Sequence, residues 1–361
     1  LDSSETQAGE IRARGINNLG GGKMVIKSGK IVAVDANGGA AIWNLADLTI
    51  EGGTFEAKYE GTSSDDYGPG CVYSEGTVLV TGGAFESANK RTYAFVSKTG
   101  SVTITPAGGK TVNISGAHGG LGIDGGTAII NGGNYSSSEY YGLYVSNDSR
   151  EANVTVNDGS FTGKNYSVWI GSDVKNLVDS TLTINGGTFN TPINEQNNAA
   201  GKLKVTGGTF SSNPGAYVAE GYKATKDESA NTWTVEKMDG YVKIEGLSGW
   251  YETLTDAAKA WRESKQVVTS GNTFGANSLG TVNSITWSVS GVVAIGNGEG
   301  VIGDNGAGQS ILGGGYFTPS VTVNSITIKG SNGAKIIKTG DSYLVSAAGQ
   351  NVVYEDITFV D

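Results

Sequence analysis

Two adjacent aspartates, Asp65 and Asp66, are the strongest candidates for acid–base chemistry in this sequence. Paired carboxylates about 5–10 Å apart can hydrolyse a glycosidic bond, one as the acid and the other as the base or nucleophile. Glu60 and Arg91 are candidate neighbours. Serine and aspartate also favour turns, and the segment at 62–68 is rich in both, so we favour a solvated loop over a catalytic pair.

Other charged groups favour a structural role. His118 is the only histidine, so it cannot contribute to a site with several histidine ligands, and we interpret it as a turn residue. Asp148, Arg150 and Glu151 are expected to form an ion pair on the surface. The glycine-rich segment 296–306 is faintly similar to a calcium-binding nonapeptide, but the repeat is not sustained. The sequence therefore predicts no metal site and no cofactor.

A third group of candidates is aromatic. Phe95, Tyr144 and Trp169 each occupy the middle of a strand-like segment, and we expect their rings to face outward in a row that Gly122 interrupts. Three tyrosines, Tyr140, Tyr141 and Tyr166, lie just before two of these segments. Such a row could stack on sugar rings or on an apolar partner. Coverage by a loop, or packing between the rings themselves, is an equally weighted alternative.

The elements that position these residues come from a repeat. The motif apolar-x-apolar-x-Gly-Gly-Thr-Phe, seen at residues 48–55, recurs along the first two thirds of the chain. Its second apolar position is occupied, at intervals of 21 to 30 residues, by Ile26, Ile50, Val80, Ile104, Ile130, Val156, Ile184 and Val205. A period in this range with alternation inside each copy is typical of a solenoid.

Each copy predicts a short strand that enters a tight corner. The apolar residues face the core, and the glycines permit positive φ angles and close approach of stacked coils. A large apolar residue follows each marker by five positions: Ile31, Phe55, Phe85, Tyr135, Phe161, Phe189 and Phe210. In the copy of Ile104 this position is Gly109, so we expect that coil to be reshaped around Pro106. Stacked coils would align the rings in an internal ladder.

A second strand recurs at the same period. Its middle residues are Ile42, Val72, Phe95, Gly122, Tyr144 and Trp169. Two strands per coil in fixed order predict an all-β, right-handed parallel β-helix. We expect about eight coils and a closing hairpin within residues 1–238, where the hairpin includes the strand 232–235.

Residues 239–361 are predicted to form a second, shorter β-helix-like domain. It begins with a helix near 253–263, because Thr253 and Asp256 resemble a capping box and Leu254, Ala257, Ala258 and Trp261 share one face. Strand-like runs follow, from 266–269 to 352–360.

Composition limits the function classes. The net charge of −10 opposes nucleic-acid binding, which requires a cationic surface. The single cysteine, Cys71, lies in a strand and is expected to be a buried thiol. No segment is long and apolar enough to span a membrane. The polar start at Leu1 is what a mature exported product would show after removal of a signal peptide.

The Gly-Gly-Thr-Phe corners, the closing segment 214–224 and the strand 232–235 resemble repeat-containing surface proteins of gut Gram-positive bacteria. This resemblance covers about residues 20–236. It implies a pectin-lyase-like β-helix in an exported wall or adhesion protein, and it transfers no catalytic residue. The fold also hosts enzymes that cleave acidic polysaccharides.

We therefore expect a secreted or cell-surface bacterial protein, a non-catalytic adhesin or scaffold that binds a glycan or a host or cell-wall partner. The predicted binding residues are Phe95, Tyr140, Tyr141, Tyr144, Tyr166 and Trp169. One alternative is a lyase or glycoside hydrolase acting on acidic glycans through Asp65 and Asp66. A purely structural stalk is the other alternative.

Overall fold

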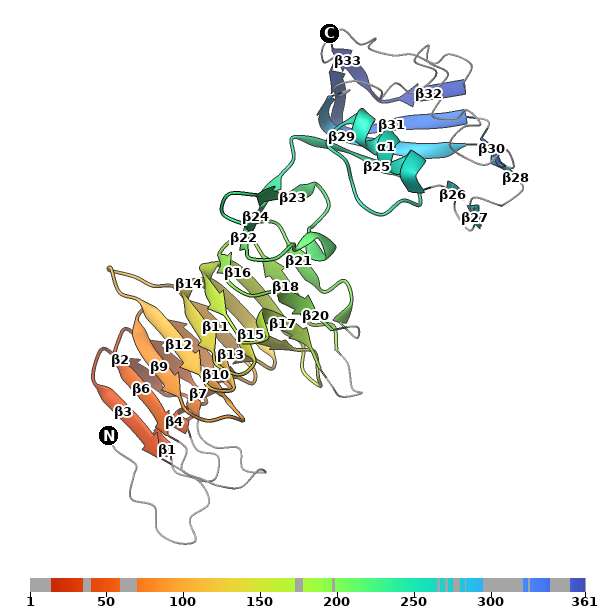
Figure 1. Ribbon diagram of the computed structural model, residues 1–361. Helices are drawn as coiled ribbons and strands as arrows, with labels where there is room; N and C mark the ends of the chain where they lie inside the picture. Colours follow the sequence, from red (N-terminus) through yellow and green to blue (C-terminus); the bar gives the residue numbers. More distant parts are fainter. Residues whose placement is uncertain are drawn as a thin grey trace. The chain divides into compact units, whose positions relative to one another are not determined.

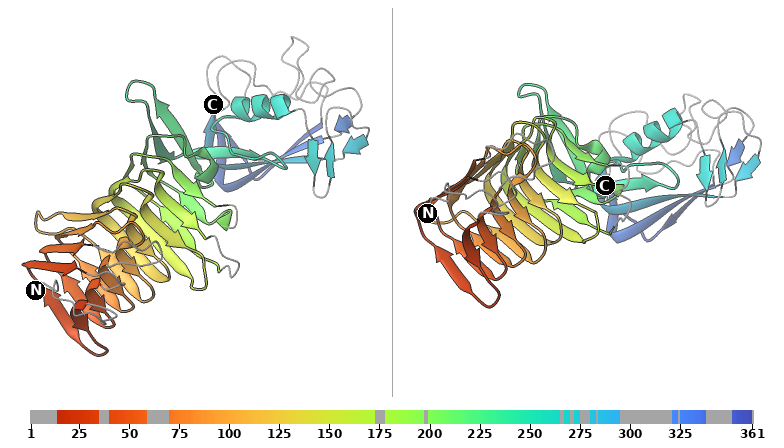
Figure 2. Two further views of the ribbon diagram at one scale, coloured as in Figure 1. Left: turned by 60° about the horizontal axis from the view of Figure 1, so that its bottom comes forward. Right: turned by 90° about the horizontal axis from the view of Figure 1, so that it is seen from below.

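The chain forms two compact units, Leu1–Glu236 and Lys237–Asp361, and its regular structure is almost entirely β (Figure 1). The computed structural model describes residues 14–34, 40–58, 70–172, 178–196, 199–264, 267–269, 272–274, 280–282, 284–294, 321–323, 325–337 and 351–360. The first unit is a parallel β-helix, whose stacked strands are visible from two further directions in Figure 2.

The first strand column contains the repeat markers. It consists of β2 (Lys23–Ile26), β5 (Asp47–Ile50), β8 (Thr77–Val80), β11 (Ser101–Ile104), the first parts of β14 (Gly126–Ser137) and β16 (Ala152–Thr162), β18 (Thr181–Ile184) and β21 (Leu203–Val205). Successive strands pair in parallel, and the eight marker residues from Ile26 to Val205 are direct partners. The predicted stacking is therefore confirmed in every copy.

The second column contains the residues of the internal ladder. Its strands are β3 (Lys30–Val34), β6 (Thr54–Lys58), β9 (Gly83–Ser87), β12 (Val112–Gly116), the later parts of β14 and β16, β19 (Thr188–Phe189) and β22 (Gly208–Phe210). The sequence predicted two strands per coil, whereas the structure has three. Glycines with positive φ, such as Gly53 at 117° and Gly83 at 129°, turn the chain and start this additional strand.

The predicted aromatic ladder is present and buried. Ring centroids lie 4.7 Å apart between Phe55 and Phe85, 4.6 Å between Tyr135 and Phe161, 5.2 Å between Phe161 and Phe189, and 4.7 Å between Phe189 and Phe210. Interplanar angles of 6–11° make each contact a face-to-face stack.

One coil keeps the ladder by a different route. Ile114 pairs with Phe85 on one side and Tyr135 on the other, so it occupies the position that spacing alone assigned to Gly109. The residues from 105 to 111 form an inserted turn, in which Pro106 lies against Gly132. The expected reshaping around Pro106 is therefore confirmed.

The third column is an eight-stranded sheet of β1 (Arg14–Asn18), β4 (Ala40–Asn44), β7 (Gly70–Ser74), β10 (Tyr93–Ser97), β13 (Gly119–Ile123), β15 (Tyr141–Ser146), β17 (Tyr166–Gly171) and β20 (Ile193–Glu195). Its register corrects the predicted alignment. Phe95 pairs with Leu121, whereas the partner of Gly122 is Val96. Phe95 is completely buried, so the prediction of an outward ring at this position is wrong.

Buried side-chain hydrogen bonds support the corner after this column. Asn18 Nδ2 donates to Asn44 Oδ1 at 2.7 Å, and Asn44 Nδ2 donates to Ser74 Oγ at 3.0 Å. The Cys71 thiol is buried and lies 3.2 Å from the carbonyl oxygens of Phe55 and Glu86, as expected for an inward-facing residue.

A hairpin closes the first unit, as predicted. A 3-10 turn (Gly215–Tyr217) leads to β23 (Tyr222–Asp227) and β24 (Thr232–Lys237). Strand β24 pairs antiparallel with β22 and sets Trp233 opposite Phe210, the last ring of the ladder. The parallel stack therefore ends on an antiparallel strand, which is the atypical terminal element that a solenoid requires.

The second unit has a sheet of β25 (Gly240–Ile244), β29 (Ile285–Ala294), β31 (Ser325–Ile337), β32 (Asn351–Glu355) and β33 (Thr358–Val360). Strand β25 is antiparallel to β29, and β31 pairs in parallel with β29, β32 and β33. Two further pairs are β26 (Val267–Thr269) with β27 (Asn272–Phe274), and β28 (Gly280–Val282) with β30 (Val321–Val323).

The predicted helix is α1 (Leu254–Ser264). Thr253 Oγ1 accepts the amide of Asp256 at 3.0 Å, which confirms Thr253 as the N-cap, and its hydroxyl donates to the Asp256 carboxylate at 2.7 Å. Leu254, Ala257, Ala258 and Trp261 are all buried, as their spacing indicated, and the Trp261 ring meets Trp287 edge to face.

Candidate functional site

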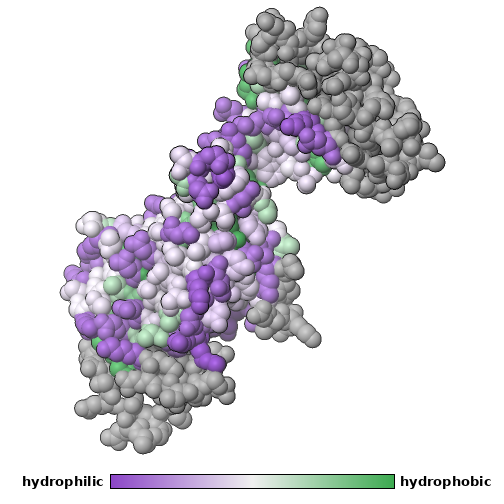
Figure 3. All heavy atoms as spheres, viewed as in Figure 1, coloured by the Kyte–Doolittle hydropathy of each residue, from purple (hydrophilic) through white to green (hydrophobic). Residues whose placement is uncertain are grey.

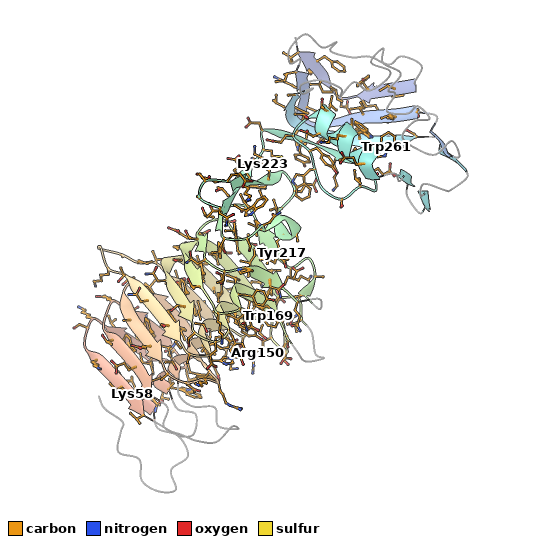
Figure 4. All side chains as sticks on the ribbon, viewed as in Figure 1. Lys58, Arg150, Trp169, Tyr217, Lys223 and Trp261 are labelled. Atoms are coloured by element: carbon orange, nitrogen blue, oxygen red, sulfur yellow. The ribbon has the colours of Figure 1, made fainter. Side chains whose placement is uncertain are left out.

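Seven ring-bearing residues gather where the second column turns into the third and on the outer face of the third column. We call this cluster the aromatic patch, and it consists of Tyr93, His118, Tyr140, Tyr141, Tyr144, Tyr166 and Trp169. Figure 4 marks the place of Trp169 on the solenoid. Five of the six predicted binding residues are members, and Phe95 is not.

Stacking between coils orders the centre of the patch. Tyr144 pairs with Trp169 in the strand register, and their ring centroids are 5.3 Å apart at 13°. Tyr141 stacks on Trp169 at 5.1 Å and 8°, although it lies three residues before Tyr144. Both tyrosines share the outer face because the strand between them contains Gly142 and turns Leu143 into the core. The stack occupies the facing sides of the Tyr144 and Trp169 rings, and the Tyr144 hydroxyl donates to the carbonyl oxygen of Gly171 at 3.3 Å.

Tyr93 completes the stack across the gap at Gly122. A Cβ atom added to Gly122 would lie 2.8 Å from Cδ2 of Tyr93, so the tyrosine ring occupies the space that a side chain would need. The same ring stacks on Tyr144 at 5.2 Å and 17°. Burial in this position raises the pKa of Tyr93 well above its ordinary value. The notch at Gly122 was visible in the sequence, but the residue that fills it was not.

His118 joins the patch at its margin. It lies in the bend between β12 and β13, which agrees with the predicted turn. Its ring meets Tyr93 edge to face at 5.1 Å and Tyr140 at 4.7 Å, and Nδ1 lies 2.9 Å from the carbonyl oxygen of Lys90. Burial lowers the pKa of the imidazole. Sequence spacing could not connect His118 with Tyr93, which lies one coil away.

Exposure varies across the patch. Tyr140 is 38% exposed, and Tyr141, Tyr144 and Tyr166 are half-buried. Trp169 is only 8% exposed, because rings of the neighbouring coil cover it. The accessible part of the patch is therefore formed mainly by tyrosines.

The same outward row continues toward the N-terminus. Trp43 and Tyr73 are register partners, and on the later strands the same position is occupied by Val96 and then by Gly122. The rings of Trp43 and Tyr73 stack at a centroid distance of 4.0 Å. The Tyr73 hydroxyl donates to Glu75 at 2.8 Å. Burial and this carboxylate raise the pKa of Tyr73 to about 12.

Asp65 and Asp66 lie outside the described residues, as do Glu60 and the segment 296–306. In the described part of the chain no ion pair joins Arg150 to Asp148 or Glu151. Asp148 accepts from Ser149 at 2.6 Å, and Glu151 accepts from Asn153 at 2.8 Å.

A carboxylate pair does occur elsewhere on the solenoid. Glu56 and Glu86 are register partners on β6 and β9, so their side chains share one face. Glu56 lies 2.6 Å from the Lys30 ammonium, and this contact lowers its pKa. A general acid needs the opposite shift. Within the described ranges, no three histidine, cysteine, aspartate or glutamate residues are grouped closely enough to hold a metal ion.

Surface hydropathy is mixed over the described part of the first unit, with polar and apolar residues interspersed (Figure 3). None of the described helices is long and apolar enough to cross a membrane. No protein-family model matches this chain, and no curated protein or solved structure matches it. The resemblance to surface proteins of gut bacteria thus stays a prediction, and the functional argument rests on the parallel β-helix and its aromatic patch.

Proposed function

We propose that this protein is a glycan-binding scaffold of a bacterial cell surface, and that the aromatic patch is its binding surface. The observation that carries the proposal is the convergence of seven rings from four successive coils, β10 to β17, on one region of the solenoid. Tyrosine and tryptophan combine an apolar ring with a polar group, which suits the apolar faces and hydroxyl groups of a sugar.

Rigidity supports this role. The strands that present the patch are in continuous parallel register, and the rings stack on one another. A surface ordered in advance loses little conformational entropy on binding. Tyrosine adds to this advantage, because it offers a large contact area with few rotatable bonds.

A purely structural role in packing is the competing explanation for the patch. The exposed rings distinguish this role from ligand binding. A ring that serves only stability is expected to be covered, as Trp169 is, whereas Tyr140 is 38% exposed and Tyr166 is half-buried at the margin. Removing these two rings is therefore expected to alter ligand binding more than folding.

A glycan array with the whole chain tests the proposal. We expect binding to at least one oligosaccharide class, and a reduction of at least tenfold in affinity for Tyr140→Ala and Tyr166→Ala with unchanged thermal unfolding. Trp43→Ala is the matched control, since Trp43 is an outward ring on β4 outside the patch. Absence of all glycan binding by a folded chain would contradict the proposal and favour a structural stalk. Cleavage of uronate-rich glycans, abolished in Asp66→Asn, would instead favour the enzyme.

Surface location is part of the same proposal. Its support is the resemblance of the corners and the closing segment to bacterial surface proteins. Protease treatment of intact cells that express the full-length gene should remove the β-helix while cytoplasmic markers survive. Recovery of the protein only from the soluble lysate of treated cells would count against export.

A further inference from the structure

Charge is distributed unevenly along the two edges of the aromatic patch. The corners that precede β10, β13, β15 and β17 carry Lys90, Arg91, His118, Glu139 and Lys164. We call this set the basic edge, because it contains three permanent cations and one acid. The corners that follow β10, β13 and β15 carry Lys98, Asp124, Asp148, Arg150 and Glu151. That opposite edge has three acids and two cations.

The basic edge runs against the character of the whole chain, whose net charge is −10. Dissolved salt screens electrostatic interactions beyond roughly 8–10 Å. Cations beside an apolar surface therefore attract an anionic group even when the molecule as a whole is acidic. The electrostatic potential at the basic edge is therefore positive, whereas the protein as a whole is negatively charged.

The cations of the basic edge are accessible. Arg91 and Lys164 are exposed, and in the described part of the chain neither side chain forms an ion pair. The Lys90 side chain is 76% exposed and lies 3.5 Å from Glu139. Three coil spacings, roughly 14 Å, separate the corner of Arg91 from that of Lys164. The edge is long enough to meet more than one anionic group of an extended ligand.

The basic edge and the rings form one continuous surface. His118 contacts both Tyr93 and Tyr140, and its Nδ1 lies 2.9 Å from the carbonyl oxygen of Lys90. Tyr140 accepts backbone hydrogen bonds from Asn165 and Tyr166, the two residues that follow Lys164. A ligand that lies over the tyrosines therefore reaches the cations without leaving the surface.

We propose that the ligand of the aromatic patch is an acidic glycan, whose carboxylate or sulfate groups bind along the basic edge while its sugar rings lie over the tyrosines. This inference rests on the proposed glycan-binding function and adds the chemical class and the orientation of the ligand. Arg91 is the strongest anchor, because its planar guanidinium can donate two parallel hydrogen bonds to one anionic group.

The same arrangement makes binding sensitive to pH through His118. The groups that face its ring are Lys90, Arg91, Glu139, Tyr93 and Tyr140. Burial lowers the pKa of the free imidazole, and a bound anion favours its protonated form. Ligand binding is then coupled to proton uptake, so affinity rises as the pH falls.

The test compares three oligosaccharides with the same backbone in neutral, carboxylated and sulfated forms. Affinities are measured by isothermal titration calorimetry with the whole chain at two salt concentrations. We expect the anionic forms to bind at least tenfold more tightly than the neutral form at low salt, and the difference to shrink at high salt. The carboxylated and sulfated arms identify which anion the basic edge prefers.

Variants connect the preference to the named residues. Arg91→Gln with Lys164→Gln should remove most of the anionic preference and leave affinity for the neutral form unchanged. Arg150→Gln, on the opposite edge, is the control. His118→Gln should abolish the rise in affinity at low pH. Thermal unfolding checks that each variant is folded.

The outcomes separate this inference from the function on which it rests. Equal affinity for neutral and anionic forms, or an unchanged preference in the double variant, would overturn the acidic-glycan inference while the glycan-binding function stands. No binding of any form by the folded chain would overturn both.

Discussion

The ring of Tyr93 occupies the space above Gly122, on the neighbouring coil. A side chain at Gly122 would collide with it, since an added Cβ lies 2.8 Å from Cδ2 and 2.9 Å from Cγ of Tyr93. The ring bridges this gap to reach Tyr144, on the far side of Gly122 in the sheet, at a centroid distance of 5.2 Å. The position of the Tyr93 ring thus depends on two missing side chains, because a Cβ added to Gly119 would lie only 2.2 Å from Cδ1 of the same ring.

Gly122→Ala is expected to displace Tyr93 from Tyr144. The added methyl group overpacks a filled site, which typically lowers the free energy of unfolding by about 1–3 kcal/mol. Gly20→Ala is the control, because no atom lies within 4 Å of the corresponding Cβ position. Urea unfolding followed by fluorescence measures both variants. Equal stability of the two would show that the ring can move without cost.

Phe161→Ala tests the internal ladder. Phe161 is completely buried between Tyr135 at 4.6 Å and Phe189 at 5.2 Å. Truncation removes both stacks and leaves a cavity, so we expect a loss of about 3–5 kcal/mol in the free energy of unfolding. Thr188→Ala, at the exposed position beside Phe189, should change it by less than about 0.5 kcal/mol. A similar small change for Phe161→Ala would mean that the neighbouring coils collapse onto the site.

Glu195→Gln tests a carboxylate with a structural role that the sequence did not indicate. Its oxygens accept the backbone amides of Gly201, Lys202 and Leu203 at 2.8, 2.8 and 2.6 Å. Glutamine replaces one acceptor oxygen with a donor group, which leaves amide hydrogens without an acceptor and should cost about 1–3 kcal/mol of unfolding free energy. Glu228→Gln, in an exposed pair with Lys226, is the control and should cost about 0–1 kcal/mol.

Alkaline titration should divide the tyrosines into two groups. Burial raises the pKa of Tyr73 to about 12 and the pKa values of Tyr93 and Tyr135 well above the ordinary value. Unfolded tyrosine loses its proton near pH 10, so between about pH 10 and 12 the folded state holds protons that the unfolded state has released. Stability therefore falls as the pH rises through this range.

Ultraviolet absorbance of tyrosinate, measured with circular dichroism on the same samples, checks this expectation. The buried tyrosines should ionise late, together with loss of structure, and Tyr135→Phe should leave a smaller late step. A single titration near pH 10 for all tyrosines, with the fold intact, would contradict the burial of these hydroxyl groups.

Residues 70–97 show why the outward aromatic row was misaligned by one residue. Alternation along a strand predicts that every second side chain faces the core, but Cys71 and Val72 are both buried, as are Ala94 and Phe95. Two consecutive residues of each strand are therefore buried, which breaks the simple alternation. Counting from the repeat therefore placed Phe95 with Tyr144, whereas the register places it with Leu143.

Properties that repeat within each coil can be predicted from the amino-acid sequence alone. Local alternation of apolar residues and the backbone freedom of glycine can be recognised in a single copy of the repeat, and recurrence strengthens both signals. They predict the markers from Ile26 to Val205, the glycine corners, the aromatic ladder and the closing hairpin. The N-cap of α1 at Thr253 is equally local. These features required no knowledge of how one coil sits on the next.

Contacts between residues of different coils depend on the three-dimensional stacking of the coils. Tyr93, His118 and Tyr140 lie 22 to 47 residues apart in the chain, and the inserted turn at 105–111 replaces the expected Gly109 with Ile114 in the ladder. Their contacts depend on the length of every intervening corner, and a shift of one residue moves a side chain to the opposite face. The repeat thus predicts a scaffold, while inter-coil register determines its aromatic patch.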